Sequence, residues 1–349
     1  MTRSVEGPLG EKKAAIIGFG GMGQRHYEAY RRNGIPVTAV CDIDAGKIRE
    51  KAPGLPKDGI FTRYQDLLER AGPDILSIVT NGPSHAEITL AASEAGVENL
   101  LCEKPVTTNL RDAREVVSAC RRNGTRLAVN HIRRWSSNYR RVKALIDGGA
   151  IGGLRHLYFN CGSTGLGNFA IHFLDIARYL TGDEPAWITG FLDRTGTPNP
   201  RGRQFVDPGG YGILSFRNGA RFYVDTSEDT GVQYTFQLVG SYGRIYIDEL
   251  NDHWQVYARD EDTRSIPLTR YGTAMTSVPF ASDAPFEIIA LTAKAQAELA
   301  AREPVSSTGE DGYRALEMVV GFHASDARGN TRVDFPLAGD DLARDVRIG

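Results

Sequence analysis

Long hydrophobic runs are missing from this 349-residue sequence, and so is an excess of charge of either sign. No apolar stretch approaches the roughly 20 residues that a membrane-spanning helix needs. The first 13 residues also lack the apolar core of a signal peptide. The 41 basic and 43 acidic residues leave a formal net charge of −2, which gives no support for binding to nucleic acid or to a membrane surface. We therefore expect a cytoplasmic protein with neither nucleic-acid nor membrane partners.

Cysteine is scarce as well. The four cysteines are scattered along the chain and form no C-x-x-C pair: Cys41, Cys102, Cys120 and Cys161. Neither a disulfide framework nor a zinc cage follows from this spacing, so we expect reduced thiols and no metal site. The length is sufficient for two domains. A hydrophobic content of 41% and a charged content of 24% are ordinary for a globular protein.

One glycine-rich stretch, 18–23, has the spacing G-x-G-x-x-G. An apolar run at 14–17 precedes it, and a helical pattern follows it as far as Arg32. In the dinucleotide-binding βαβ unit, such glycines permit a tight turn and let a pyrophosphate approach the N-terminus of a helix. This context predicts a dinucleotide site. We expect its cofactor-binding residues to include Gly18, Phe19, Gly20, Gly21, Met22 and Gly23.

An acidic residue closes the next apolar run, at 37–41. Asp42 lies 24 residues after Gly18, close to the offset at which an acid binds the adenosine ribose hydroxyls. A carboxylate there repels the 2′-phosphate of NADP, and Asp44 adds to that repulsion. Asp42 is therefore predicted to bind the cofactor, which we expect to be NAD rather than NADP.

A regular alternation of short apolar runs and helical patterns continues to about residue 130. The six expected strands are 14–17, 37–41, 60–61, 75–79, 99–102 and 126–130. Apolar runs of this kind are typical of parallel strands whose two faces are both covered by helices. The pattern predicts a Rossmann domain, a doubly wound parallel sheet, over residues 12–132 after a disordered tail at 1–11.

Two of these strands end in polar residues. Ligands bind at the carboxyl ends of the strands in an open α/β sheet. We therefore expect the turn after 75–79 and the Glu103-Lys104-Pro105 turn after 99–102 to face the cofactor. The cofactor-binding residues predicted in these turns are Thr80, Asn81, Pro83, His85, Glu103 and Lys104.

The second half of the chain has a different texture. After helical patterns at 137–146 and 168–180, short alternating strands follow from Trp187 to about residue 268, separated by hairpin turns such as Asn218-Gly219. Two further helical patterns and a last strand near Val333 complete the chain. Residues 133–349 are thus predicted to form an α+β domain, with a large, mostly antiparallel open sheet and helices on one face. Its final helix and strand are placed where they can pack back toward the first domain.

The glycine fingerprint, the Glu103-Lys104-Pro105 turn and His172 with Asp175 on one helix together resemble the Gfo/Idh/MocA family, the relatives of glucose–fructose oxidoreductase and inositol dehydrogenase. The resemblance covers residues 12 to 336. It implies hydride transfer between NAD and the carbinol or keto carbon of a sugar, cyclitol or nucleotide-linked sugar. It also implies a homodimer or homotetramer assembled through the C-terminal sheet.

The resemblance further implies that Lys104 and His172 act on the substrate hydroxyl. Most family members have an aspartate one helical turn before this histidine, but this chain has Asn168, which cannot accept a proton. The predicted catalytic residues are Lys104, His172 and Asn168, and the predicted substrate-binding residues are Lys104, Arg134, Trp135, Asn168 and His172. For Trp135, His85 and His131, packing is the alternative interpretation.

Two other functions remain open at this point. One is a redox-neutral reaction, a glycoside cleavage or an epimerisation, in which tightly bound NAD is recycled. The other is a non-catalytic regulator that senses NAD or a sugar, although Lys104 and His172 argue against it. For a nucleotide-linked sugar, Arg201 or Arg203 is the candidate phosphate contact.

Overall fold

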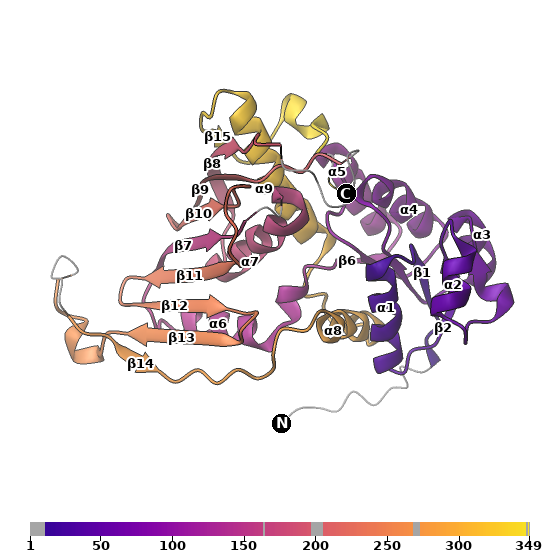
Figure 1. The fold of residues 1–349 in the computed structure, drawn as a ribbon, viewed down its shortest axis with the longest axis horizontal. Coiled ribbons are helices and arrows are strands. Elements are labelled where there is room, and N and C mark those ends of the chain that lie inside the picture. The colour runs from indigo at the N-terminus through magenta and orange to yellow at the C-terminus, as the bar shows by residue number, and fades with distance from the viewer. Residues whose placement is uncertain (1–10, 163–164, 197–204, 268–272, 347, 349) are drawn as a thin grey trace. The chain divides into compact units, whose positions relative to one another are not determined.

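The computed structural model describes residues 11–162, 165–196, 205–267, 273–346 and 348. The chain forms two compact units (Figure 1). Unit 1 takes its residues from 1–135, 287–316 and 343–349, and unit 2 takes its residues from 136–286 and 317–342. Two stretches from the second half of the sequence therefore belong to unit 1. All but one residue of the predicted tail at 1–11 lies outside the described residues.

Unit 1 is built on a six-stranded sheet with the order β3-β2-β1-β4-β5-β6. All its neighbouring strands are parallel. The strands are β1 (Ala14–Ile17), β2 (Val37–Cys41), β3 (Ile60–Phe61), β4 (Ile75–Ile78), β5 (Asn99–Cys102) and β6 (Arg126–Val129). This confirms the predicted doubly wound parallel sheet. Each strand begins and ends within one residue of its predicted bounds. The prediction was accurate because a strand buried on both faces is a continuous apolar run that is easily recognised in the sequence.

Helices cover both faces of this sheet (Figure 1). They are α1 (Gly21–Arg32), α2 (Ala45–Lys51), α3 (Tyr64–Ala71), α4 (Gly82–Glu94), α5 (Leu110–Arg122) and α8 (Ile288–Ala300). Helices α1 and α8 pack against each other and contact the strands, while α3, α4 and α5 pack in a row. Helix α8 thus reaches β4, β5 and β6 from a distant part of the sequence.

Helix α4 begins at Gly82, within the stretch that was predicted to be a turn. Asn81 precedes the helix in an extended conformation, and Pro83 occupies its first turn, where a proline costs no hydrogen bond. Pro83 and His85, predicted to lie in a turn, are therefore part of the helix.

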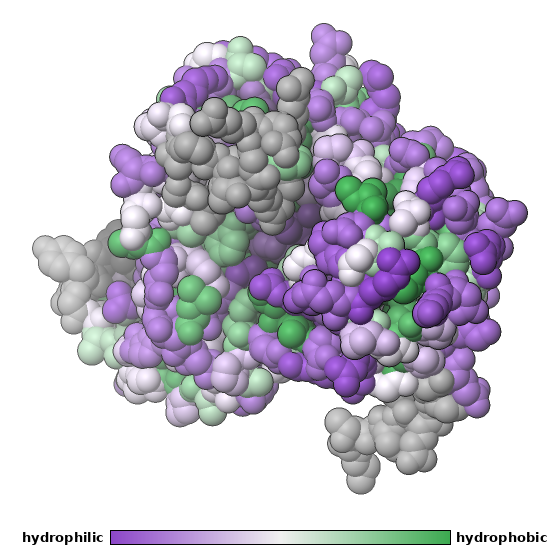
Figure 2. Space-filling model, turned by 45° about the vertical axis from the view of Figure 1, so that its right-hand side comes forward, coloured by the Kyte–Doolittle hydropathy of each residue, from purple (hydrophilic) through white to green (hydrophobic). Residues whose placement is uncertain are grey.

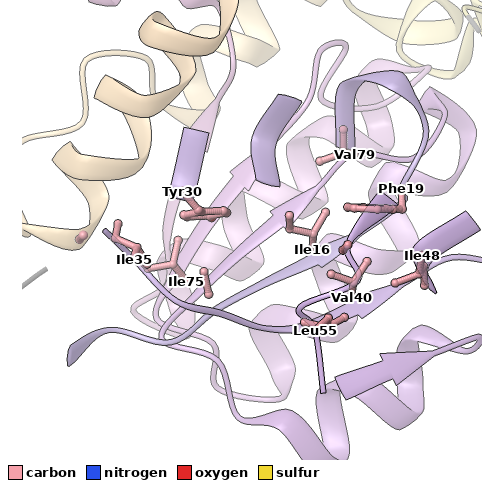
Figure 3. Packing of buried hydrophobic residues seen from close by; sticks show 12 residues of the cluster. Ile16, Phe19, Tyr30, Ile35, Val40, Ile48, Leu55, Ile75 and Val79 are labelled. Atoms are coloured by element: carbon pink, nitrogen blue, oxygen red, sulfur yellow. The ribbon is translucent and has the colours of Figure 1, made fainter. Parts of the chain in front are cut away.

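The apolar core beside the glycine turn is shown in Figure 3. Ile16 on β1 and Val40 on β2 face Phe19 and Ile48, while Tyr30 of α1 lies over the same side of the sheet. Phe19 is fully buried, and its ring makes an edge-to-face contact with Tyr27. The second residue of the fingerprint therefore anchors the turn in the core.

Unit 2 is built on a nine-stranded sheet with the order β14-β13-β12-β11-β7-β10-β9-β8-β15. Its strands are β7 (Leu154–Asn160), β8 (Pro185–Leu192), β9 (Gly210–Phe216), β10 (Arg221–Asp225), β11 (Thr235–Gly240), β12 (Gly243–Asp248), β13 (His253–Ala258), β14 (Thr276–Val278) and β15 (Val333–Asp334). Only the β7–β10 pair is parallel among these described strands. The predicted, mostly antiparallel sheet is confirmed; β14 was not predicted, since three residues carry little periodicity.

The helices of this unit are α6 (Ser137–Asp147), α7 (Ile171–Thr181) and α9 (Gly309–Ala327), the last of which begins in unit 1. Phe322 of α9 packs so closely on β8 and β9 that a Cβ at Gly190 would lie 2.4 Å from its ring. The opposite side of the sheet carries Tyr158 and Tyr211, which are 40% and 47% exposed. In the visible surface of Figure 2, hydrophobic residues appear as separate patches among hydrophilic ones.

One predicted helix has an irregular start. Residues Leu166–Ala170 form a π-helical turn, and the α-helix begins only at Ile171. Asn168 lies in the π-helical turn and His172 in α7. The prediction that Asn168 lies one helical turn before His172 assumed a continuous α-helix, in which positions four apart are neighbours. Glycines at 165 and 167 are poor helix formers and allow the irregular turn.

Candidate active site

Two kinds of glycine occur in the 18–23 turn. Gly18 has a φ of +93°, and a Cβ there would lie 2.5 Å from the carbonyl oxygen of Val79. A Cβ at Gly23 would lie 2.1 Å from the carbonyl oxygen of Gly18. By contrast, a Cβ at Gly20 or Gly21 would meet nothing within 4 Å. Gly18 and Gly23 are thus required by the fold itself, whereas Gly20 and Gly21 expose backbone at the start of α1.

Asp42 follows β2 and contacts this turn directly. Its Oδ2 accepts a 2.6 Å hydrogen bond from the backbone N–H of Phe19, and its Oδ1 accepts one of 3.0 Å from Asp44 N–H. The ammonium of Lys47 lies 3.8 Å from Oδ1. The carboxylate is therefore held in a fixed position beside the glycine turn, and it stabilises that turn by accepting the hydrogen bond from Phe19.

A cleft of about 580 Å³ opens at this edge of the parallel sheet. The predicted residues that line it are Gly18, Gly20, Asp42, Thr80 and Asn81. Sequence reasoning missed several others, among them Ile43, Thr62, Tyr64 and Glu87. The signal was present, because Thr62 follows the short strand β3, and its carboxyl end faces the same edge as those of β1, β2 and β4.

Two of the missed residues form a pair across the cleft lining. The Tyr64 hydroxyl donates a hydrogen bond to Oε1 of Glu87. Burial, together with the hydrogen bond and charge of Glu87, raises the pKa of Tyr64 to about 12. Ile43, next to Asp42, is 95% exposed. A large exposed apolar residue beside a cleft of this size is suited to covering the flat face of a ligand ring.

This geometry fits a dinucleotide. The N-terminus of α1 begins at Gly21 with no side-chain cap, so its first-turn N–H groups and the positive end of its dipole are directed to the ligand side. Gly20 and Gly21 leave room for close approach of a pyrophosphate, and Asp42 supplies an acceptor for ribose hydroxyls. The cleft thus combines backbone N–H donors with a carboxylate acceptor, as binding of NAD requires.

His85 connects two of the predicted turns. Its Nδ1 lies 2.6 Å from the carbonyl oxygen of Pro105, and its Nε2 lies 3.0 Å from that of Thr80. Burial lowers the pKa of His85, against the opposing effect of the two carbonyl contacts. The ring is almost fully buried, which favours the packing interpretation of this residue. It holds the turn after β4 against the turn after β5.

Glu103 and Lys104 follow β5, and the peptide bond from Lys104 to Pro105 is cis. The Glu103 carboxylate faces inward, where its Oε1 accepts hydrogen bonds from His26 Nε2 at 3.0 Å and Asn130 Nδ2 at 2.7 Å. Lys104 is half-buried at the strand end. The two neighbouring charges therefore have different environments.

In unit 2, the turn that carries Asn168 is held by a carboxylate that sequence reasoning missed. Asp207 accepts hydrogen bonds from the backbone N–H groups of Gly167 at 2.8 Å and Asn168 at 2.6 Å. His172 is half-buried near the start of α7, and Asp175 is buried further along it. Asp207 is distant in sequence and follows no recognisable motif, so only the structure places it here.

Arg134 and Trp135, predicted to bind substrate, are buried in unit 1. The Trp135 indole N–H donates a 2.6 Å hydrogen bond to Glu298 on α8. The Arg134 guanidinium lies 3.2 Å from the carboxylate of Asp311 and donates to the carbonyl oxygen of Ser306. These contacts favour the packing interpretation for Trp135 and show that Arg134 stabilises the fold. His131, which precedes them in the sequence, is also buried.

Comparison with known proteins identifies the family of both units. A model described as an oxidoreductase family with an NAD-binding Rossmann fold matches residues 12–131, and a GFO/IDH/MocA C-terminal domain matches residues 158–246. Inositol 2-dehydrogenase 3 of Saccharopolyspora erythraea is 30% identical over 258 residues, which are 68% of this chain and 73% of that protein.

Solved structures share the fold. An oxidoreductase from Agrobacterium radiobacter, in complex with NAD+, L-tartaric acid and magnesium, has a TM-score of 0.77 and 23% identity, covering 93% of this chain and 98% of its own. An inositol dehydrogenase homologue from Azotobacter vinelandii, with NADH and myo-inositol, has a TM-score of 0.78 and 18% identity, covering 93% and 97%.

In the part of the chain that the structure describes, no helix has the length and apolarity to cross a membrane. The family model confirms NAD as the cofactor and confirms that the chain is an oxidoreductase. The chain belongs to the Gfo/Idh/MocA family of NAD-binding oxidoreductases.

Proposed function

We propose that this enzyme transfers hydride between NAD and the carbinol or keto carbon of a sugar, a cyclitol or a nucleotide-linked sugar. The observation that carries the proposal is the cleft of about 580 Å³ beside the glycine turn and Asp42, at the sheet edge where β5 also delivers Lys104. A dinucleotide in this cleft lies at the carboxyl ends of the parallel strands, where ligands of such sheets bind.

Bound NAD supplies the hydride acceptor for oxidation of the carbinol. In this proposal, His172 accepts the hydroxyl proton as the carbon loses its hydride, because imidazole is a base of suitable strength near neutral pH. The Lys104 ammonium stabilises the negative charge that develops on the same oxygen. Asn168 orients the substrate by hydrogen bonding, since its amide cannot take up a proton.

The names of relatives support this substrate class. Besides the inositol 2-dehydrogenases, one relative is a D-apiose dehydrogenase from Paraburkholderia graminis, 31% identical over 49% of this chain. The fold is also shared with a UDP-N-acetylglucosamine 3-dehydrogenase from Acidithiobacillus ferrooxidans, at a TM-score of 0.74 and 21% identity. Arg201 and Arg203, the candidate phosphate contacts for such a substrate, lie outside the described residues.

The test is a screen of sugars, cyclitols and sugar nucleotides for absorbance at 340 nm with NAD. Net NADH formation with one class supports the proposal and selects the substrate. An enzyme that retains NAD through purification and converts a sugar without net absorbance change would indicate the redox-neutral reaction instead. Binding of a sugar with no conversion of any kind would indicate a regulator.

The proposal extends to assembly through the uncovered side of the unit 2 sheet. Tyr158 stacks on Tyr223 at 4.9 Å, Phe191 stacks on Tyr211 at 4.8 Å, and Ile213 of β9 is an exposed residue of the same sheet. Flat aromatic pairs of this kind are suited to pack against a second copy of the chain. In sedimentation experiments, Ile213→Lys should shift the protein toward monomer, while Leu250→Lys, an exposed apolar residue in a loop, should not.

The proposed location is the cytoplasm. All four cysteines are buried thiols. This supports a protein kept in a reducing compartment, and fractionation of the native host followed by immunoblotting tests it.

A further inference from the structure

A buried polar network lies beneath the Glu103-Lys104 turn in unit 1. It joins residues from α1, β4, the end of β5, the end of β6 and α8. Its members are His26, Tyr30, Ser77, Glu103, Asn130 and Thr292, all of them at most 7% exposed. Tyr30, labelled in Figure 3, lies over the sheet on the same side as Ile16. Six polar side chains from five segments are costly to bury, so their arrangement calls for an explanation.

Glu103 is the acceptor at the centre of this network. His26 Nε2 and Asn130 Nδ2 both donate to its Oε1, at 3.0 Å and 2.7 Å. Burial raises the pKa of Glu103, but its contacts with His26, Asn130 and Lys104 outweigh that effect and lower the pKa to about 2. Glu103 is therefore ionised at neutral pH and accepts hydrogen bonds only.

The remaining contacts extend the network from Glu103 to Ser77 and Tyr30. Because Glu103 only accepts, His26 donates from Nε2. Its Nδ1 lies 3.1 Å from the Ser77 hydroxyl, which lies 2.9 Å from the Tyr30 hydroxyl. One arrangement of hydrogens satisfies every member of the chain: Tyr30 donates to Ser77, Ser77 donates to His26 Nδ1, and His26 Nε2 donates to Glu103.

The second carboxylate oxygen bears on the neighbouring residue. Oε2 of Glu103 lies 3.3 Å from the backbone nitrogen of Lys104, which donates to it. The backbone N–H of Glu103 in turn donates to Ile78 on β4 at 2.9 Å. The carboxylate thus folds back on the peptide from which the Lys104 side chain projects.

We propose that Glu103, held by His26 and Asn130, is a positioning residue that fixes the backbone of Lys104 and so the direction of its ammonium. This inference rests on the proposed function of Lys104. It differs from the role of direct cofactor ligand expected for Glu103 from the sequence, because the inward contacts occupy its carboxylate. Positioning errors of about 1 Å cost on the order of 10²-fold in rate, so such support matters.

Three variants test the inference. Glu103→Gln keeps the size of the side chain, but its amide cannot accept from His26 and Asn130 on one oxygen and from Lys104 on the other. His26→Leu removes one donor. His26→Gln keeps both a donor toward Glu103 and an acceptor toward Ser77. Ser93→Ala is the control, because Ser93 is buried and hydrogen-bonded to Thr125, away from the network.

With the substrate found in the screen, Glu103→Gln and His26→Leu should lower kcat about 10- to 100-fold. Fluorescence titration should give them an unchanged Kd for NADH. His26→Gln should keep kcat within about fivefold of wild type, the equivalent of one hydrogen bond. Ser93→Ala should lower only the midpoint of urea unfolding.

Three results would overturn the inference. Near-normal kcat in Glu103→Gln would show that Lys104 needs no such support. A raised Kd for NADH in that variant would show that Glu103 binds the cofactor directly. A His26→Gln variant as impaired as His26→Leu would show that His26 does not act through the hydrogen bond that it donates to Glu103. Failure of the proposed function is distinguishable, because then Lys104→Met itself keeps full turnover.

Discussion

Unit 1 and unit 2 expose their sheets to solvent in different ways. In β1, β4 and β5 every residue is buried, whereas in β7 buried and more exposed residues alternate. The parallel strands therefore present polar groups only at their ends, and the cofactor cleft gathers there. The antiparallel sheet exposes side chains along one of its faces, among them those of Tyr158 and Tyr211. A sheet buried on both faces concentrates function at one edge, whereas a half-covered sheet leaves an area for packing.

The largest effect is expected at the residue assigned as base in unit 2. His172→Ala should lower turnover about 10²- to 10⁴-fold, the usual contribution of a general base. One ionisation should also disappear from the pH–rate profile, while Asn168→Asp should be tolerated. NADH affinity should not change if cofactor binding belongs to unit 1. An unaltered pH profile in His172→Ala would place the base elsewhere; His253→Ala, an exposed histidine in the same unit, is the control.

The next effect concerns the charged residue that unit 1 contributes. Lys104→Met should lower turnover about 10²- to 10³-fold, because it removes an electrostatic donor to the substrate oxygen. Fluorescence titration should show unchanged NADH binding. Lys51→Met, an exposed lysine of the same unit, should behave as wild type. Wild-type turnover in Lys104→Met would show that the Glu103-Lys104-Pro105 turn only ends the strand and takes no part in catalysis.

The two sheets should also respond differently to truncation of neighbouring residues. Ile75 and Leu76 of β4 are both fully buried, so replacing either with alanine should cost about 2–5 kcal/mol. In β11, Phe236→Ala should lower the free energy of unfolding by about 3–5 kcal/mol. Gln237→Ala, at the half-buried position next to it, should lower it by no more than about 0.5 kcal/mol. Equilibrium urea unfolding measures the stability of all four variants. A large loss at only one of the two β4 positions would contradict the contrast between the sheets.

Acid should weaken unit 1 through Glu103. The pKa of this carboxyl is lowered from 4.5 to about 2 in the folded protein, so the ionised form is favoured by folding. The resulting stability is present above pH 4.5 and is lost as the pH falls toward 2; a shift of this size corresponds to roughly 3 kcal/mol. Urea midpoints measured between pH 6 and pH 3 should fall less steeply for Glu103→Gln than for wild type. Parallel slopes would contradict the prediction.

The smallest effect is expected for cofactor choice. Asp42→Asn should narrow the preference for NADH over NADPH by about fivefold, the effect of one charge pair in water at 4 Å. Asparagine is preferable to alanine here, because Asp42 also accepts a hydrogen bond from Phe19 N–H and alanine would disturb the glycine turn. Fluorescence titration with both reduced cofactors checks this, with Asp58→Asn, at an exposed position that does not line the cleft, as control. Tighter NADPH binding by wild type would refute the preference altogether.

Local patterns were sufficient to predict most elements. The strand bounds of unit 1 follow from short apolar runs, and the glycine turn follows from residues that sit side by side in the sequence. The missed features involve partners far apart. Glu298 and Asp311 hold Trp135 and Arg134 from more than 160 residues away, and Asp207 holds the turn at Asn168. No periodicity encodes such pairs.

By itself, the sequence determined the two kinds of sheet, the NAD fingerprint and the candidates Lys104, His172 and Asn168. The two kinds of sheet and the fingerprint depend on strand and helix periodicity and on glycines that adopt backbone angles closed to other residues, which are local properties. The three candidates come from the resemblance to the family. Only the tertiary structure decided that α8 packs on β4, β5 and β6, that the Glu103 side chain points inward to His26, and that Asn168 lies in a π-helical turn. Each of these depends on which distant side chain fills the adjacent space, and that is set by the path of the whole chain.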